Sequence, residues 1–262
     1  RPLINGNVVL LIALGLAGAF LAIRDGRDEL AGVLLALTTI KPQVTLVVLV
    51  FIVLWAIKQS RWRIIFWLGG SVLLLGFASA LLIPDWIVQN LREVLRYPGY
   101  NPPGTIIAAM TEIFPSFGRR VSVAIVIILA VLLIVEWWFG RHKLFRRFYW
   151  TLCFTLVASQ WLFIQTDPGN FIIMMPVLVY VMQIIDERWQ TYGQMINIIM
   201  MLVLLIGIWI IFISTLEYGL QPQQSPVMFL PLPALLMLLM YWFRWWAIRP
   251  ASLWYEEINS VA

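Results

Sequence analysis

The feature that most constrains the fold is a succession of apolar runs that follow one another along almost the whole chain. Of the 262 residues, 62% are hydrophobic and only 12% are charged, and the mean hydropathy is +0.90. A water-soluble domain has about 45 to 50% apolar and about 25% charged residues. The surplus of apolar side chains therefore excludes an ordinary soluble protein and predicts one that lies in a membrane.

We expect an all-α fold, a polytopic bundle of transmembrane helices that forms a single domain over residues 1–262. A helix needs about 20 apolar residues to cross a hydrocarbon layer of about 30 Å. The chain has about nine apolar segments, several of them short: Val8–Ile23, Leu30–Ile40, Val44–Ile57, Ile64–Ile83, Val121–Phe139, Phe148–Gln165, Phe171–Ile185, Met195–Thr215 and Val227–Phe243. Because apolar sequence begins almost directly after Arg1, without a signal-peptide pattern, we expect a fragment that lacks one or more N-terminal helices.

The second and third segments are separated only by Lys41, Pro42 and Gln43, so they form either one kinked helix or two short ones. The distribution of charge favours two. If the chain reverses at Pro42, most of the 18 basic residues, including the clusters at 24–27 and 58–63, lie on one side. The positive-inside rule assigns that side to the cytoplasm. The same topology puts the C-terminus in the cytoplasm and residues 84–120 outside.

Lys41 lies at the break between these two short segments. Leu30–Ile40 would extend only about 16 Å as a helix, too little to cross lipid unaided. A break at such a depth must be buried in protein or line a polar cavity. An ammonium group there commonly marks a ligand pathway, and we favour this interpretation over a lysine that snorkels to the outer headgroups.

Residues 84–120 form a long polar stretch, which we expect to be an outer loop with short amphipathic helices. Apolar residues recur at helical spacing over 87–96, which predicts a helix lying on the membrane surface. The run from Tyr97 to Gly104 is rich in proline and glycine and is predicted to be non-helical, whereas Thr105–Phe114 is predicted to be a second short helix. Arg92 and Arg96, one turn apart, would bind a phosphate or, with equal weight, lie among lipid headgroups.

Four other residues carry weaker signals. Glu136 lies one turn inside a segment, and we expect it to pair with Arg141 or Lys143. His142, in the same basic cluster, is expected to be exposed or to touch headgroups. Cys153 is the one cysteine, which excludes a disulfide and a Cys-based metal cluster. Asp167 begins an Asp-Pro-Gly turn, and at even odds it is a turn former or a polar site residue.

The chain shows none of the motifs of soluble enzymes, such as a Gly-rich phosphate loop, HExxH or GxSxG. Ionisable residues are rare within the apolar segments, which argues against a channel or a proton-coupled carrier. The net charge of +5 is best explained by basic loops beside anionic headgroups. We therefore expect membrane lipids as partners, no nucleic acid, no metal and no cofactor.

Several short elements near the N-terminus resemble a known family. They are Asn5-Gly6-Asn7, Ala31-Gly32-Val33-Leu34-Leu35-Ala36-Leu37, Ile40-Lys41-Pro42 and Arg61-Trp62-Arg63. In this order they resemble the polytopic GT-C glycosyltransferases, and among them the bacterial polyprenol-phosphate-mannose-dependent mannosyltransferases. The resemblance covers roughly residues 5–67 well. The first element has Gly-Asn where that branch usually has Gly-Gln.

The resemblance implies that a sugar such as mannose is transferred, with inversion, from a polyprenyl-phosphate donor to a lipid or glycan acceptor. Transfer would take place on the outer face of a membrane, in this case a bacterial plasma membrane. Lys41, Arg92 and Arg96 would bind the donor phosphate. The cavity would be lined by Asn5, Asn7, Tyr97, Tyr100, Asn101, Asp167 and Asn170. In relatives the catalytic base is an aspartate in an outer loop upstream of this sequence, so the base is unknown here.

Two other classes of function stay open. A transporter or flippase for a lipid-linked amphipathic substrate would also need a basic cavity that opens outward, but it should show inverted repeats with a second helix break. A structural membrane subunit without chemistry would tolerate the loss of Lys41. The leading prediction is a glycosyltransferase.

Overall fold

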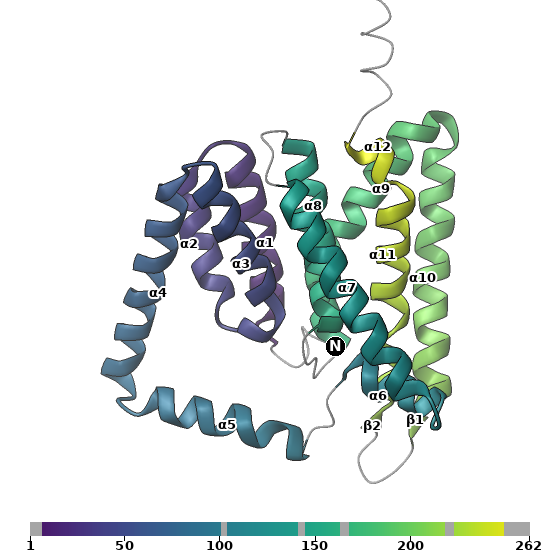
Figure 1. The fold of residues 1–262 in the computed structure, drawn as a ribbon, viewed down its shortest axis with the longest axis horizontal. Coiled ribbons are helices and arrows are strands. Elements are labelled where there is room, and N and C mark those ends of the chain that lie inside the picture. Colours follow the sequence, from purple (N-terminus) through teal and green to yellow (C-terminus); the bar gives the residue numbers. More distant parts are fainter. Residues whose placement is uncertain (1–6, 101–103, 141–144, 163–167, 218–222, 249–262) are drawn as a thin grey trace, which may run out of the picture.

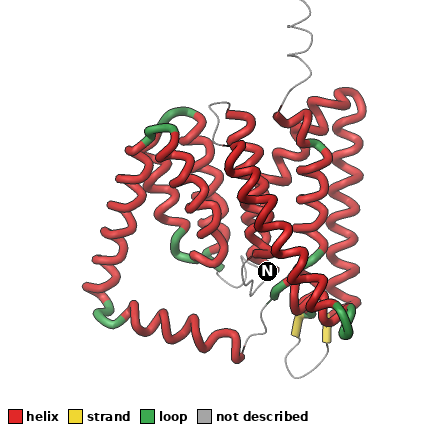
Figure 2. The backbone as a smooth tube through the Cα atoms, viewed as in Figure 1, coloured by secondary structure: helices red, strands yellow, loops and turns green. Residues whose placement is uncertain are grey.

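The computed structural model describes residues 7–100, 104–140, 145–162, 168–217 and 223–248, and the side chains within them except those of 94, 95, 97–100, 216, 217, 223 and 224. Most of this part of the chain is helical; short turns join the helices, and there is one pair of two-residue strands (Figure 2). The elements are α1 (Val9–Arg24), α2 (Asp28–Thr38), α3 (Pro42–Lys58), α4 (Trp62–Leu82), α5 (Trp86–Tyr100), α6 (Ile106–Ile113), α7 (Gly118–Gly140), α8 (Phe145–Leu162), η1 (Pro168–Met174), α9 (Met175–Trp189), η2 (Gln190–Tyr192), α10 (Gly193–Thr215), β1 (Leu216–Glu217), β2 (Gln223–Gln224), η3 (Pro226–Phe229), α11 (Pro231–Trp242) and α12 (Arg244–Ile248).

The helices agree with the all-α prediction, and each of the nine predicted segments overlaps one of them. Within the described ranges, three stretches are long and apolar enough to cross a membrane: Trp62–Leu82, Gly118–Gly140 and Pro168–Thr215. The last of these contains α9 and α10 with the short η2 between them. Shorter apolar helices lie at Val9–Arg24, Pro42–Lys58 and Pro226–Trp242. The chain is thus an integral membrane protein, and nine separate crossings stay a prediction.

Different turns and short elements lie at the two ends of the bundle (Figure 1). The turns at 25–27 and 59–61, the η2 turn and α12 lie at one end, which we call the basic end. The α2–α3 turn, α5, α6 and the strand pair lie at the other, which we call the polar-loop end. This distribution is the one expected if the chain reverses between the second and third segments.

Side-chain contacts between the first two turns of the basic end confirm the reversal. Arg61, which precedes α4, donates to Asp28 Oδ1 from Nε at 2.9 Å and also to the Ile23 carbonyl oxygen at 3.0 Å. Arg63 Nη1 lies 3.1 Å from Glu29 Oε1. A single kinked helix would have placed these two clusters at opposite ends of the bundle.

The α2–α3 break forms because proline begins the new helix. Pro42 occupies the first turn of α3, where a missing N–H costs nothing, and Lys41 before it has the non-helical φ of −122° that a following proline favours. Threonines satisfy carbonyl groups around the end of α2. Thr38 donates to Leu35 O at 2.7 Å, and Thr45 donates to Thr38 O at 3.1 Å. Polar backbone at this depth is therefore hydrogen-bonded within the protein.

Helix α8 forms the centre of the core. It packs against α3, α7, α9, α11 and α12, and its side chains are buried on all sides over Thr151–Gln160. Trp150 Nε1 donates to the Met240 carbonyl oxygen at 3.0 Å, and Trp137 Nε1 donates to Thr155 Oγ1 at 2.9 Å. These bonds fix the register of α8 against α11 and α7.

The prediction that the run from Tyr97 is non-helical is wrong for its first four residues. Helix α5 continues through Pro98 to Tyr100. The φ of proline, about −65°, is itself helical, so its cost is one backbone hydrogen bond and crowding of the preceding turn. The end of a helix can absorb that cost. The second predicted helix, Thr105–Phe114, is confirmed as α6, with Thr105 Oγ1 accepting from Ala108 N at 3.1 Å.

The structure gives Glu136 a partner that the sequence did not suggest. Its two carboxylate oxygens accept from Arg244 Nε at 3.1 Å and Nη2 at 3.0 Å, and Tyr241 Oη lies 3.3 Å from Oε1. Sequence proximity suggested Arg141 or Lys143, which lie with His142 outside the described residues. The tertiary fold instead brings α12 against α8 and its neighbours and supplies the arginine.

Candidate functional site

Three of the predicted site residues meet at the polar-loop end. The ammonium Nζ of Lys41 donates to Asn7 Oδ1 at 2.6 Å and lies 3.3 Å from Asn170 Oδ1. Asn7 and Asn170 lie 34 and 129 positions from Lys41 along the chain, so only the fold can join them. We call this group the lysine cluster.

Each member of the lysine cluster is held by the end of a helix. Asn7 precedes α1, and its Oδ1 also accepts from the Val9 backbone N–H at 3.2 Å, which satisfies a donor of the first turn. Lys41 is fixed by the α2–α3 break. Asn170 lies in η1, which packs against α1, and only 1% of its surface is exposed. The cluster is therefore positioned by helix termini rather than by a free loop.

The cluster combines a cation with an available amide donor. The Lys41 ammonium has three N–H donors, and two of its acceptors are the amide oxygens just described. Asn170 Nδ2 is buried and has no hydrogen-bond partner in the described part of the chain. A buried donor left unpaired is costly, on the order of 1–3 kcal/mol, which an acceptor oxygen of a ligand would relieve. Chemically, such a pair suits an anionic oxygen such as that of a phosphate.

The other two predicted phosphate ligands lie elsewhere. Arg92 and Arg96 are exposed on α5. In Figure 1 this helix runs beneath the bundle, at the same end as the lysine cluster but apart from it. Tyr97 and Tyr100 lie on α5 too, and their side chains are outside the described ones. Asn5, Asn101 and Asp167 lie outside the described residues. The structure thus brings Asn7 and Asn170 to Lys41 and does not bring α5 there.

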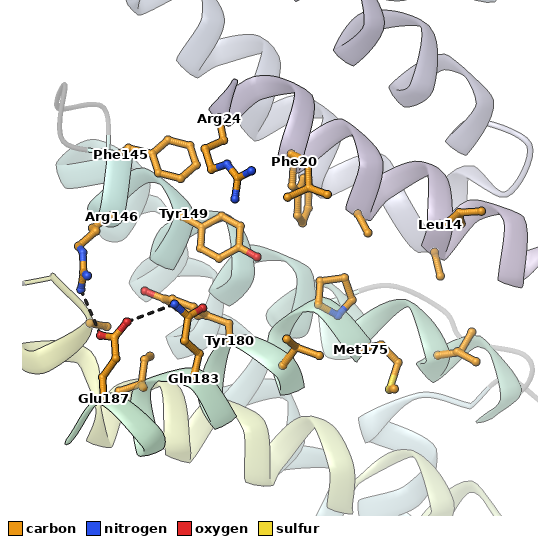
Figure 3. A pocket seen from close by; sticks show the side chains of 18 residues that line it. Leu14, Phe20, Arg24, Phe145, Arg146, Tyr149, Met175, Tyr180, Gln183 and Glu187 are labelled. Carbon is orange, nitrogen blue, oxygen red and sulfur yellow. Dashed lines mark hydrogen bonds and ion pairs between the residues drawn. The ribbon is translucent and has the colours of Figure 1, made fainter. Parts of the chain in front are cut away.

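A groove between α1 and α9 was not foreseen from the sequence. It has a volume of about 670 Å³. It is lined by α1, by the first turns of α8, by η1 and by α9 along most of its length (Figure 3). Its walls are mainly apolar, and its charged residues, Arg24, Arg146 and Glu187, gather at one end. Periodicity could not reveal it, because its two main walls are helices more than 140 positions apart in the sequence.

Within the described ranges, no three His, Cys, Asp or Glu side chains gather in a way that could hold a metal ion. At the lysine cluster, the described side chains supply a cation and hydrogen-bond donors, which suit stabilisation of a departing anion.

Comparison with known proteins gives one match. The family model of glycosyltransferase family 87 matches residues 1–159, which is more than half of the chain and includes the lysine cluster's Asn7 and Lys41. No curated protein and no solved structure matches the chain.

Proposed function

The chain belongs to glycosyltransferase family 87, and on that premise we propose that it transfers a sugar, such as mannose, from a polyprenyl-phosphate donor to a lipid or glycan acceptor. The lysine cluster is the observation that carries this proposal. In such a transfer the sugar leaves a lipid phosphate, and the negative charge that develops on the phosphate must be stabilised. Lys41 Nζ and the unpaired Asn170 Nδ2 are a cation and a donor of the kind this step needs.

The charge distribution supports an outer position for the reaction. The basic end carries Arg27, Lys58 and Arg188 with their neighbours, and short basic loops are retained in the cytoplasm. The lysine cluster lies at the opposite end, so it would face the outer side of a bacterial plasma membrane. Helices α11 and α12 return to the basic end, which would leave the C-terminus in the cytoplasm.

A phosphate donor with a lipid tail suits this location. Nucleotide sugars are made in the cytoplasm and do not reach an outer site unaided, whereas a polyprenyl-phosphate sugar is itself a membrane lipid. Arg92 and Arg96 on the exposed face of α5 would either bind the same phosphate, if α5 approaches the cluster, or lie on lipid headgroups. The N-terminal motifs, which resemble those of the GT-C mannosyltransferases, imply the same donor and the same side of the membrane.

The stereochemistry we propose is inversion, in a single displacement. Inversion requires a base that removes the proton of the acceptor hydroxyl. We assign no described residue to this role. The lysine cluster would act only on the leaving group, and the family match favours this chemistry over transport of the intact lipid.

The donor is tested with isolated membranes that contain the protein. They are given radiolabelled polyprenyl-phosphate mannose, polyprenyl-phosphate glucose or nucleotide-activated mannose, with an inhibitor of polyprenyl-phosphate sugar synthesis in each reaction. We expect label to move to a lipid or glycan product from one of the polyprenyl-phosphate sugars and not from the nucleotide sugar. Transfer from the nucleotide sugar under these conditions would overturn the proposed donor.

A further inference from the structure

The groove between α1 and α9 runs from the apolar middle of the bundle toward the basic end. Small and apolar side chains form its floor and walls, among them Ala13, Ala17, Phe20, Ile172 and Val179. Over the part of α1 from Ala13 to Arg24 it extends about 16 Å, at 1.5 Å per residue. An elongated apolar groove of this size fits a hydrocarbon chain.

The charged end of the groove lies at the basic end. In Figure 3, Arg24 reaches from α1 toward Tyr149, while Arg146 reaches from α8 toward Glu187, and Leu14 and Met175 lie toward the other end. The lining charges are therefore two arginines and one carboxylate. This end is opposite to the lysine cluster, so a ligand whose charged group lies here has its headgroup on the other side of the membrane from the proposed donor phosphate.

The ion pairs of the two arginines leave them accessible to a ligand. Arg24 Nε lies 2.9 Å from Asp25 Oδ1, with side chains 56% and 42% exposed. Arg146 Nη1 lies 3.5 Å from Glu187 Oε2, with side chains 49% and 43% exposed. Gln183 Nε2 shares the same carboxylate, donating to Glu187 Oε1 at 3.1 Å. Exposed pairs of this kind contribute little to stability, so a phosphate can add to or replace them.

We propose that this groove binds an anionic phospholipid of the membrane leaflet at the basic end. Its phosphate lies against Arg24 and Arg146, and one acyl chain lies between α1 and α9. Charge complementarity selects the headgroup, because guanidinium groups bind phosphate with charge-assisted hydrogen bonds. The Tyr149 hydroxyl and Gln183 add polar contacts beside it. The site is independent of the lysine cluster and of the proposed donor.

The proposal is tested by native mass spectrometry of the purified protein in detergent, supplied with phosphatidylglycerol or with phosphatidylcholine of the same acyl chains. We expect phosphatidylglycerol to be retained in preference. The double variant Arg24→Gln and Arg146→Gln should lower its occupancy about tenfold or more, since hydrogen bonds to charged groups are the strong ones. Arg63→Gln is the matched control, because Arg63 is exposed at the same end and does not line the groove.

A second variant tests the apolar part of the site. Ala17→Trp places an indole in the groove and should lower lipid retention although both arginines remain. The thermal midpoint of each variant shows whether it is folded. The proposal is overturned if the double variant of the arginines retains as much phosphatidylglycerol as Arg63→Gln does, or if the two phospholipids bind equally. Preferential retention of polyprenyl phosphate would also overturn it, by assigning the groove to the donor.

Discussion

Replacing Arg244 with alanine should destabilise the protein strongly, because it leaves the Glu136 carboxylate buried without its cation. The side chain of Glu136 is 6% exposed and accepts two hydrogen bonds from the guanidinium. Removing one partner of a buried pair costs about 3 to 5 kcal/mol. Arg244 is itself 33% exposed, so we expect the low end of that range, about 3 kcal/mol. For a chain of this size, that corresponds to a fall in Tm of roughly 6 to 12 °C.

The assay is thermal unfolding of the purified protein in detergent, followed by the loss of monodisperse protein. Arg63→Ala is the matched control, because its pair with Glu29 has side chains 76% and 44% exposed and should contribute only about 0 to 1 kcal/mol. The double variant Glu136→Gln and Arg244→Ala removes the uncompensated charge and should be more stable than Arg244→Ala alone. If Arg244→Ala and Arg63→Ala unfold at the same temperature, the buried ion pair does not stabilise the contact between α7 and α12.

Two further predictions concern packing and topology. Gly32→Ala should cost about 1 to 3 kcal/mol, because the new Cβ would lie 2.7 Å from a backbone carbonyl oxygen of α4, whereas Gly69→Ala meets nothing within 4 Å. Thermal midpoints compare the two, and equal values would show that α2 and α4 are not closely packed. In a chain whose buried Cys153 is replaced by alanine, Arg27→Cys and Lys58→Cys should react with an impermeant maleimide from the same side of the membrane, and Asn90→Cys from the other. Reaction of the first two from opposite sides would contradict the reversal at Pro42.

The helices and the reversal could be predicted from sequence because they depend on local signals. Apolar runs set the helix positions, Pro42 set the start of α3, and the positive-inside rule placed the Arg24 and Arg61 turns together, as Asp28 and Arg61 confirm. Lys41 was singled out by the cost of an ammonium group at that depth. Asn7 and Asn170 entered through the family resemblance, and their contact with Lys41 is a property of the fold.

Long-range packing could not be predicted in the same way. The pairing of Glu136 with Arg244 joins residues 108 positions apart, whereas the sequence drew attention to the nearer basic residues. The continuation of α5 through Pro98 depends on how much one lost hydrogen bond costs at a helix end. The groove between α1 and α9 depends on which helices become neighbours, and hydrophobic periodicity does not predict that.

The most direct test of the central claim measures donor use by Lys41→Ala in membranes that contain the protein. Lys58→Ala is the control, because Lys58 is an exposed lysine at the end of α3 that lies at the basic end. Transfer per amount of folded protein should fall about 100-fold or more for Lys41→Ala, since a lost stabilising donor at a developing anion typically costs that much. The amount of folded protein and the activity of Lys58→Ala should stay near wild type. Transfer by Lys41→Ala equal to that by Lys58→Ala would contradict the assignment of the donor phosphate to the lysine cluster.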